Sequence, residues 1–483
     1  MNITHPTPHR VIVIGGGITG LSAAHRLVEA QKDSHPQIEV SLVEAGDRVG
    51  GTINTSEQDG FLIEYGPDSF LSTKPWALAL CRRLGIEKNV IPTNGTFRRS
   101  YILSQGRLHP IPEGFLMLAP TKFLPFVTSR LFTWPGKLRM GIDLFLPRGP
   151  VLDDESLASF VTRRLGREAL ERIAQPLVGG IYTADPQTLS LRATMPRFLE
   201  METKHRSIIK AMWSERRAMA KRSRGKVSGK ADGGARYSQM VSFDRGMQTI
   251  VDAIMDRMPE GLVETGQTVL KVRRQENAWQ VEMADHSIHT ADSVMVAVPA
   301  YRAAELLSEL DTELATHLSD IPYASSLVVN LAYRREDVPH PLDGFGFVVP
   351  AIEKRSLIAC SFSSIKFADR APEGHALLRA FVGGATQKHL VDLDDNELLK
   401  IVQTDLEDIL AIRAKPLFTS ISRHPASMPQ YPVNHLADVA RIQEYVAKHT
   451  GLAVIGNAYS GIGMPDCVHS GEAAVEQILD RLK

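Results

Sequence analysis

The chain has little cysteine: Cys81, Cys360 and Cys467 are the only three in 483 residues, and no two of them form a Cys-x-x-Cys pair. Scattered thiols of this kind exclude a disulfide framework and a recognisable zinc site, and they are typical of a reducing compartment. We therefore expect a protein without bound metal. No stretch of roughly 18 apolar residues is present, which argues against a transmembrane helix. The first apolar run, residues 11–14, is too short for a secretory signal, so the sequence predicts a cytoplasmic protein.

An excess of charge of one sign is also lacking, because 55 Lys and Arg residues balance 55 Asp and Glu residues. A net charge of zero gives no electrostatic basis for binding nucleic acid, so we expect no nucleic-acid partner. The hydrophobic fraction of 43% is ordinary for a soluble globular protein. A chain of 483 residues is too long for one core and predicts two or three domains.

What the chain does have is an apolar strand, a glycine-rich turn and a helix near its start. The turn reads Gly15-x-Gly17-x-x-Gly20, and a second apolar strand at residues 38–43 ends in Glu44. This is the βαβ dinucleotide fingerprint in its full context. Gly15 permits the tight turn, Gly17 lets the backbone approach a pyrophosphate, and Gly20 lets helix and strand pack closely.

Glu44 is expected to accept hydrogen bonds from the adenosine ribose, and the helix N-terminus to attract the phosphates. The alternative is a glycine-rich turn without a ligand. The expected phosphate-binding residues are Gly15, Gly16, Gly17, Ile18, Thr19 and Gly20.

A second glycine pair follows Glu44 closely, in the stretch Ala45-Gly-Asp-Arg48-Val-Gly-Gly51-Thr52. It lets another loop lie against the cofactor. The arrangement resembles FAD-binding flavoproteins of the glutathione reductase and amine oxidase type, and plain NAD dehydrogenases do not usually carry it. The alternative is an ordinary surface turn. The residues expected to contact FAD here are Ala45, Arg48, Gly51 and Thr52.

The C-terminal part repeats this pattern, with a strand at residues 452–455, a glycine-rich loop at 456–466 and a closing helix at 467–482. A helix N-terminus at this place can stabilise the negative charge that develops at N1/C2=O of reduced flavin. Cys467 lies beyond the glycine loop, on the helix, and is interpreted as a packed thiol. The sequence therefore predicts FAD that is bound without a covalent bond.

Three further segments have a recognisable character. Residues 101–110 predict a hairpin. Residues 113–147 are rich in Phe, Leu, Met and Pro with interspersed Arg and Lys. They fit either a helical hairpin lying on a membrane or the apolar lid of a substrate cavity. Residues 214–238 are basic and glycine-rich, and they are interpreted as a mobile, solvated loop.

Five motifs outside the fingerprint carry a resemblance to a known family. They are Gly66-Pro67-Asp68-Ser69-Phe70, residues 175–186, Leu189-Ser190, Met428-Pro-Gln-Tyr431, and Gly461-Ile-Gly-Met-Pro-Asp-Cys467. As a set they are similar to the porphyrinogen oxidases of haem synthesis, over essentially the whole chain except the N-terminal lead and the basic loop. The chain most resembles the bacterial type, whose members oxidise coproporphyrinogen III to coproporphyrin III.

The resemblance implies the α/β multidomain fold of p-hydroxybenzoate hydroxylase and the amine oxidases. That fold has a Rossmann-type FAD-binding domain, a substrate domain of mixed sheet and a helical domain that contacts the membrane. We expect the FAD-binding domain to comprise residues 1–95, 240–300 and 436–483. We expect the helical domain at 96–200. The substrate domain would take residues 201–239 and 301–435.

The resemblance also assigns individual residues. Gly180 would place its carbonyl near the reactive substrate carbon, Phe367 would pack on the macrocycle, and Val348 would be an aliphatic clamp. The residues that it implies around FAD are Gly66, Pro67, Asp68, Ser69, Val269, Asn457, Ile462, Gly463 and Met464.

Substrate carboxylates need cations at the rim of the pocket. Plant relatives place an arginine where this chain has Ser100, so the anchor has to come from elsewhere. Each candidate has the alternative reading of an ordinary solvated charge. The candidates are Lys74, Arg98, Arg99, His205 and Arg206.

The activity that the resemblance implies is oxygen-dependent removal of six electrons from coproporphyrinogen III, with three O2 reduced to three H2O2. FAD supplies the difficult chemistry, so no catalytic acid–base pair is required, and catalytic side chains stay unassigned. Alternatives are oxidation of protoporphyrinogen IX, a flavin amine oxidase or carotenoid-type desaturase, and a non-enzymatic GDP-dissociation-inhibitor-like binding protein. The resemblance further suggests a homodimer and peripheral contact with the inner face of the cell membrane.

Overall fold

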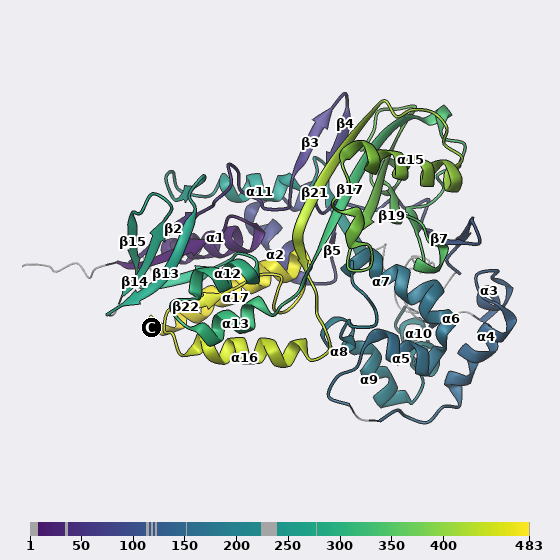
Figure 1. Cartoon of the computed structure of the whole chain (residues 1–483), viewed down its shortest axis with the longest axis horizontal. Coiled ribbons are helices and arrows are strands. Elements are labelled where there is room, and N and C mark those ends of the chain that lie inside the picture. The colour runs from purple at the N-terminus through teal and green to yellow at the C-terminus, as the bar shows by residue number, and fades with distance from the viewer. Residues whose placement is uncertain are drawn as a thin grey trace, which may run out of the picture.

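The structure, a computed structural model, describes residues 8–33, 37–112, 115–116, 119–120, 123–150, 152–223, 239–276 and 278–482. Figure 1 shows an elongated molecule. One end contains the predicted dinucleotide fingerprint and is called the nucleotide-binding part here. A large sheet and a group of helices lie together at the other end.

A parallel sheet of five strands forms the centre of the nucleotide-binding part, in the order β12-β2-β1-β16-β22. Residues 11–14 of β1 are all buried, as expected for an apolar strand covered on both faces. Helices α1 (Ile18–Asp33) and α17 (Met464–Arg481) pack in the core on one side of the sheet. The strands are β1 (His9–Ile14), β2 (Ile38–Val43), β12 (Val263–Glu264), β16 (Ser293–Val296) and β22 (Leu452–Val454).

The other face of this sheet is covered by an antiparallel three-stranded sheet and by three helices. Trp279 and Leu307, both fully buried, belong to the core between them. The covering elements are β13 (Val269–Gln275), β14 (Ala278–Met283), β15 (Ile288–Ala291), α12 (Ala300–Leu307), α13 (Thr312–Ser319) and α16 (His435–Ala447).

A mixed sheet of seven strands, in the order β21-β17-β20-β19-β18-β7-β8, forms the second part. Helix α15 (Asp395–Leu410) packs on one face through Leu398, Val402 and Leu406. Its strands are β7 (Tyr101–Ser104), β8 (Arg107–Pro110), β17 (Tyr323–Arg334), β18 (Gly346–Val348), β19 (Leu357–Phe362), β20 (His375–Gly383) and β21 (Phe418–Pro429).

Helices facing the other side of this sheet share one apolar core with Ile102, Val348 and Ala359 of its strands. A π-helical turn at Leu170–Ala174 leads directly into α7. The helices are α3 (Phe123–Thr128), α4 (Trp134–Gly141), α5 (Leu157–Leu165), α6 (Arg167–Ala169), α7 (Gln175–Tyr182), α8 (Leu191–Thr194), α9 (Pro196–His205) and α10 (Ile208–Ser223).

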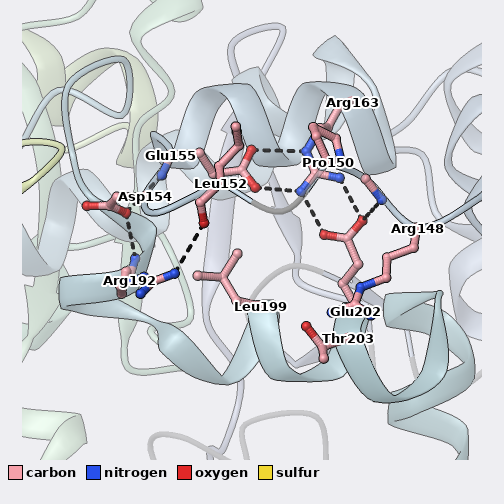
Figure 2. Close-up of a pocket in the computed structure, with 11 residues that line it drawn as sticks. Arg148, Pro150, Leu152, Asp154, Glu155, Arg163, Arg192, Leu199, Glu202 and Thr203 are labelled. Atoms are coloured by element: carbon pink, nitrogen blue, oxygen red, sulfur yellow. Dashed lines mark hydrogen bonds and ion pairs between the residues drawn. The ribbon is translucent and has the colours of Figure 1, made fainter.

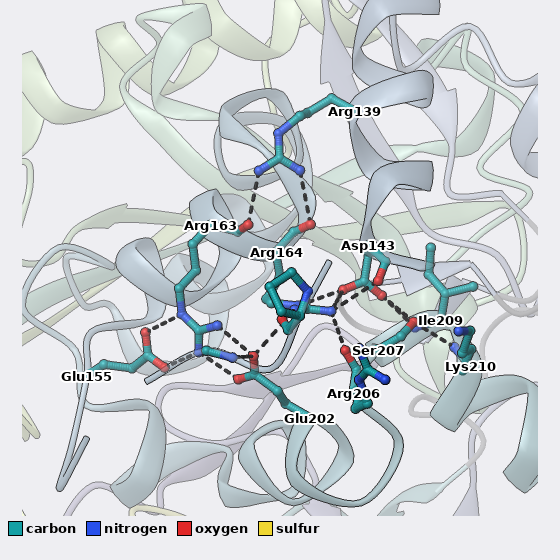
Figure 3. Close-up of polar contacts among 12 residues, drawn as sticks. Arg139, Asp143, Glu155, Arg163, Arg164, Glu202, Arg206, Ser207, Ile209 and Lys210 are labelled. Atoms are coloured by element: carbon teal, nitrogen blue, oxygen red, sulfur yellow. Dashed lines mark hydrogen bonds and ion pairs between the residues drawn. The ribbon is translucent and has the colours of Figure 1, made fainter. Parts of the chain in front are cut away.

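Buried ion pairs tie these helices together (Figure 3). Arg164 donates to the Asp143 carboxylate at 2.7 Å, and Asp143 also accepts from Ser207 at 2.7 Å. Arg163 bridges Glu155 and Glu202. These pairs join the start of α10, α5 and α9 to the 3-10 turn Ile142–Leu144.

Shorter elements connect the parts. The remaining strands are β3 (Thr55–Gln58), β4 (Phe61–Glu64), β5 (Phe70–Leu71), β6 (Val90–Pro92), β9 (Phe115–Leu116), β10 (Ala119–Pro120) and β11 (Met240–Phe243). The remaining α-helices are α2 (Pro75–Leu84), α11 (Gln248–Met255) and α14 (Ser363–Lys366).

The predicted α/β fold and the hairpin at residues 101–110 are confirmed, but three of the expected domain boundaries differ. Strands β7 and β8 pair with the large sheet instead of joining the helical part. Helices α9 and α10 pack in the helical core, and α12 and α13 pack on the nucleotide-binding sheet. The apolar face of a strand or helix packs against the elements that lie beside it in the folded protein. Those elements can be distant in the sequence, so the order of segments along the chain does not determine them.

The expected basic loop at residues 214–238 is also corrected in part. Residues 214–223 continue helix α10, and residues 224–238 lie outside the described part of the chain. In the segment 113–147, residues 113–114, 117–118 and 121–122 are likewise outside it.

Candidate functional site

The glycine turn between β1 and α1 has the geometry of a phosphate site. A Cβ added at Gly20 would overlap the backbone oxygen of Gly15, so only glycine lets α1 pack this closely on the strand. A Cβ added at Gly17 would meet nothing within 4 Å, so that position faces open space. The first turn of α1, including Ile18 and Thr19, presents backbone N–H groups without intrahelical partners to the same space.

Glu44 sits beside this turn. Its carboxylate accepts hydrogen bonds from the backbone N–H of Gly16 at 2.6 Å and of Gly46 at 2.8 Å. The backbone N–H of Gln267 donates to the Glu44 carbonyl at 2.8 Å, which brings the chain just before Val269 alongside. Glu44, the predicted ribose acid, and the chain just before Val269, which the resemblance places around FAD, are therefore close together, and the turn already orients Glu44.

Glu44→Ala removes an acceptor for a ribose hydroxyl and also the two hydrogen bonds that orient the turn. Loss of a hydrogen bond to a charged group costs roughly 1.5–3 kcal/mol, so we expect FAD affinity to fall about tenfold to a hundredfold. Turnover at saturating FAD should survive. Titration of apoprotein with FAD, followed by flavin fluorescence, measures the affinity. A variant that is fully loaded with flavin but inactive would contradict this role.

Arg48 stabilises the backbone of the second glycine turn, which contains Gly50 and Gly51. Its guanidinium donates to the carbonyls of Val49 at 3.1 Å, Ile53 at 2.9 Å and Gly51 at 2.7 Å. The turn docks on the phosphate site through the N–H of Gly50, which donates to the Gly16 carbonyl at 2.8 Å. Arg48 therefore supports the cofactor loop by holding its backbone.

The loop Gly66–Ser69 lies against this turn, because a Cβ at Gly66 would overlap the Thr52 carbonyl oxygen. Asp68 in the loop receives hydrogen bonds from Lys366 at 2.8 and 2.9 Å, and Arg379 lies 3.6 Å away. Burial alone would raise the pKa of Asp68, but the two cations outweigh it and hold that pKa below its ordinary value. The ionised Asp68 side chain thus fixes the loop Gly66–Ser69 to Lys366 and to Arg379 of the large sheet.

Lys366 and Arg379, which the motifs did not select, hold the loop Gly66–Ser69 through Asp68 and the Gly66 carbonyl. Arg379 is 3% exposed, donates to the Gly66 carbonyl, and has an Nε–H without a partner among the described residues. It stands directly opposite Asn330, whose buried Oδ1 also lacks a partner there. A charged residue inside the apolar strand 375–383 was the available signal. Two orphaned polar atoms beside Gly66 fit a bound polar group such as a flavin ring.

At the flavin end, the C-terminal loop runs from Gly456 to Gly461, which have φ values of +137° and +138°. Asn457 lies inside this loop, and Ile462 and Gly463 lead from it into α17, which begins at Met464. Helix α17 contacts β5, the strand that directly follows the loop Gly66–Ser69.

The predicted carboxylate anchors are placed unequally. Lys74 is paired with Asp466, in the first turn of α17, at 2.5 and 2.7 Å, so its charge is already used. Arg98 and Arg99 are exposed just before β7, and Arg99 pairs with Asp343 at 3.3 Å. His205 and Arg206 end helix α9 and are exposed.

Gly180 and Val348 meet across α7 and β18, since a Cβ at Gly180 would lie 3.6 Å from the Val348 side chain. Phe367 is 2% exposed, and Lys366 Nζ and Arg370 Cζ lie 5.2 and 5.6 Å from the centroid of its ring. The half-buried Phe381 shares the sheet face of Val348, since both pair with Ala359.

A pocket between α9 and residues 148–154 lies within the helical part (Figure 2). Arg163 forms ion pairs with Glu155 and Glu202, the Arg192 guanidinium donates to the Leu152 carbonyl, and the Arg192 backbone N–H donates to Asp154. It contains none of the predicted site residues, so it is no candidate for the flavin or the substrate.

Residues 18–479 match the family of flavin-containing amine oxidoreductases. The chain belongs to this family. It is an FAD-dependent oxidoreductase, and the glycine turn, Glu44 and the C-terminal loop described above fit that cofactor. No helix in the described part of the chain is long and apolar enough to cross a membrane.

Relatives and solved structures cover nearly the whole chain. Coproporphyrinogen III oxidase of Bacillus subtilis is 38% identical over 98% of both chains. Protoporphyrinogen oxidase 1 of Spinacia oleracea is 30% identical, covering 98% of this chain and 84% of its own. The crystal structure of a putative protoporphyrinogen oxidase from Exiguobacterium sp. 255-15 superposes with a TM-score of 0.84 at 30% identity, covering 97% of this chain and 98% of that one.

Proposed function

We propose that this chain catalyses the FAD- and oxygen-dependent oxidation of coproporphyrinogen III to coproporphyrin III. The observation that carries the proposal is the 38% identity, over 98% of both chains, to a coproporphyrinogen III oxidase. Two further relatives of that name, from Staphylococcus aureus and Propionibacterium freudenreichii, are each 34% identical. The test is aerobic turnover of coproporphyrinogen III, with porphyrin fluorescence and O2 uptake measured together.

The glycine turn, Glu44 and the C-terminal loop would hold FAD, which would supply two-electron oxidation as an acceptor of hydride from a bridging CH2 of the substrate. Each hydride is accompanied by one proton, and tautomerisation between rounds makes the total loss four hydrogens from the bridging carbons and two from pyrrole nitrogens. Three rounds remove the six electrons, and three O2 take them up as H2O2.

The chain's own residues bind and orient the macrocycle. Gly180 and Val348 form one wall, and Phe381 and Ile462 stand half-buried at the edge of the same apolar core. Such a wall excludes water and holds a flat, largely apolar ring, while the cations Arg98 and Arg99 are proposed to meet carboxylates at the rim.

The second candidate is oxidation of protoporphyrinogen IX, which is favoured by the 30% identity to the Spinacia oleracea enzyme of that name. The two substrates differ in charge, since the first carries four propionates and the second carries two. A site for the first has to accept carboxylates around most of the ring.

We also propose a peripheral contact with the inner face of the cell membrane. Helices α3 and α4, with the residues just after them, carry large exposed apolar side chains, and Figure 1 shows these helices at the end away from the nucleotide-binding sheet. Arg130 and Arg148 are exposed in the same segment and suit anionic headgroups. The exposed apolar residues are Leu124, Trp134, Leu138, Ile142 and Phe145.

We also propose a homodimer, which rests on the resemblance alone. Light scattering in solution tests it.

Trp134 and Phe145 are 65% and 83% exposed. A double variant with serine at both positions should therefore fold normally and bind vesicles about tenfold or more weakly. Co-sedimentation with phosphatidylglycerol vesicles measures the binding. The matched control is Ile288→Ser, an apolar residue 58% exposed in the nucleotide-binding part, which should bind like the wild type. Equal binding by all three proteins would contradict the membrane contact.

A further inference from the structure

Tyr431 follows strand β21 and closes the C-terminal glycine loop. Its hydroxyl donates to the Asn457 carbonyl at 2.5 Å and accepts from the Gly461 N–H at 2.8 Å. Tyr431 is 2% exposed, so water cannot easily replace either bond. Burial raises the pKa of this hydroxyl above its ordinary value, which keeps its proton available for Asn457.

The two bonds join the ends of one short segment. Gly456 and Gly461 supply the positive-φ turns on either side of Asn457, and the hydroxyl bridges residue 457 to residue 461. The path of the chain into α17 therefore depends on this hydroxyl. Loss of the hydroxyl would leave a carbonyl and an N–H without partners in a largely buried place.

The ring of Tyr431 is held from below by His435. The two rings are stacked, with centroids 4.0 Å apart and planes 11° apart. Burial lowers the pKa of His435 to about 4, so the imidazole is neutral near pH 7 and stacks without a charge. The hydroxyl is thus attached to a rigid support.

The backbone of the same residue is tied to the helical part. The Ser190 N–H donates to the Tyr431 carbonyl at 2.8 Å, and Leu189 bridges to Pro432. The neighbouring Gln430 side chain donates to the Tyr182 carbonyl at 3.2 Å, at the end of the helix that carries Gly180. Tyr431 therefore contacts the C-terminal loop through its hydroxyl and Ser190 of the helical part through its carbonyl, and its neighbour Gln430 contacts the end of α7.

We propose that Tyr431 is a positioning residue that fixes the C-terminal flavin loop to the helical part, and so sets the distance between flavin and substrate. The role toward FAD rests on the flavin-dependent family of the chain and on the assignment of the C-terminal loop to the flavin. The role toward the substrate rests on the proposed function. No proton or electron passes through the tyrosine in this account.

The test compares Tyr431→Phe with Tyr333→Phe. Tyr333 on β17 is equally buried, at 1% exposed, and packs in the core of the large sheet, so the control removes the same atom outside the C-terminal loop. Apoprotein is titrated with FAD, the visible circular dichroism of bound flavin is recorded, and kcat and KM are measured at saturating FAD. A second variant, His435→Leu, keeps the hydroxyl but removes its support.

For Tyr431→Phe we expect the Kd for FAD to rise roughly tenfold, because two modest hydrogen bonds are lost. The dichroism of bound flavin should change, and kcat should fall with little change in KM. His435→Leu should shift the Kd in the same direction by less, and Tyr333→Phe should match the wild type.

An unchanged Kd and dichroism in Tyr431→Phe, with only a lower melting temperature, would overturn the proposal and leave a structural tyrosine. If the wild type does not oxidise porphyrinogens but the Kd still rises in this variant, the proposed function fails and the positioning role toward FAD stands.

Discussion

Gly17→Val is expected to give a folded but colourless protein. A Cβ at this position meets no atom of the chain within 4 Å, so the fold has room for the new side chain. The space that it fills is where the first turn of α1 presents its N–H groups to a pyrophosphate. We expect FAD affinity to fall by about a thousandfold or more, which corresponds to roughly 4 kcal/mol. The absorbance of purified protein near the flavin band measures the loss.

The matched control is Gly141→Val in α4, where an added Cβ also meets nothing within 4 Å. This variant should be yellow and as stable as the wild type. Gly20→Val makes the opposite comparison, because its Cβ would overlap the Gly15 backbone, and it should fail to fold. A Gly17→Val protein that retains FAD would remove the phosphate site from the account.

Gly180→Val should abolish most turnover while leaving FAD bound. Gly180 is exposed on α7, and an added Cβ comes to 3.6 Å from Val348 on β18, so the branched side chain narrows the proposed space for the macrocycle. We expect kcat/KM for coproporphyrinogen III to fall about a hundredfold or more, that is by roughly 3 kcal/mol of transition-state stabilisation. Steady-state kinetics and the flavin spectrum measure the two effects separately.

Two companion variants make this result specific. Gly179→Val changes the neighbouring position, where an added Cβ meets only the flexible end of Gln175 at 3.5 Å, and it should keep most activity. Adding Val348→Ala to Gly180→Val should restore part of the lost kcat/KM, because it removes the group that the new side chain meets. A fully active Gly180→Val enzyme would show that the substrate lies elsewhere.

The phosphate site could be read from the sequence because its chemistry is local. Gly15, Gly17 and Gly20 act through a single turn, and Glu44 follows on the adjacent parallel strand. The same holds for the glycine loop before α17, where a turn and a helix N-terminus are consecutive in the chain.

The charged supports of the flavin loop could not be read in this way. Lys366 meets Asp68 across 298 positions and Lys74 meets Asp466 across 392 positions. No spacing rule connects residues so far apart, and a lysine in a sequence looks the same whether it is solvated or paired. Lys74 was expected at a substrate carboxylate for that reason.

Only part of the proposed substrate wall could be predicted from the sequence. The resemblance selected Gly180 and Val348, which lie together, and Phe367, which is buried beside Lys366 and Arg370. The register of β18, β19 and β20 is what places Phe381 on the face of Val348, and a register is a property of paired strands. A single strand shows only that its side chains alternate.

The most direct test of the account is a side-by-side aerobic assay of the purified yellow protein with coproporphyrinogen III and protoporphyrinogen IX. Porphyrin fluorescence, O2 uptake and H2O2 are followed together. The account predicts a higher kcat/KM for coproporphyrinogen III, with three O2 consumed for each porphyrin formed and weaker use of the dicarboxylate. A clear preference for protoporphyrinogen IX, or no porphyrin from either substrate, would contradict it.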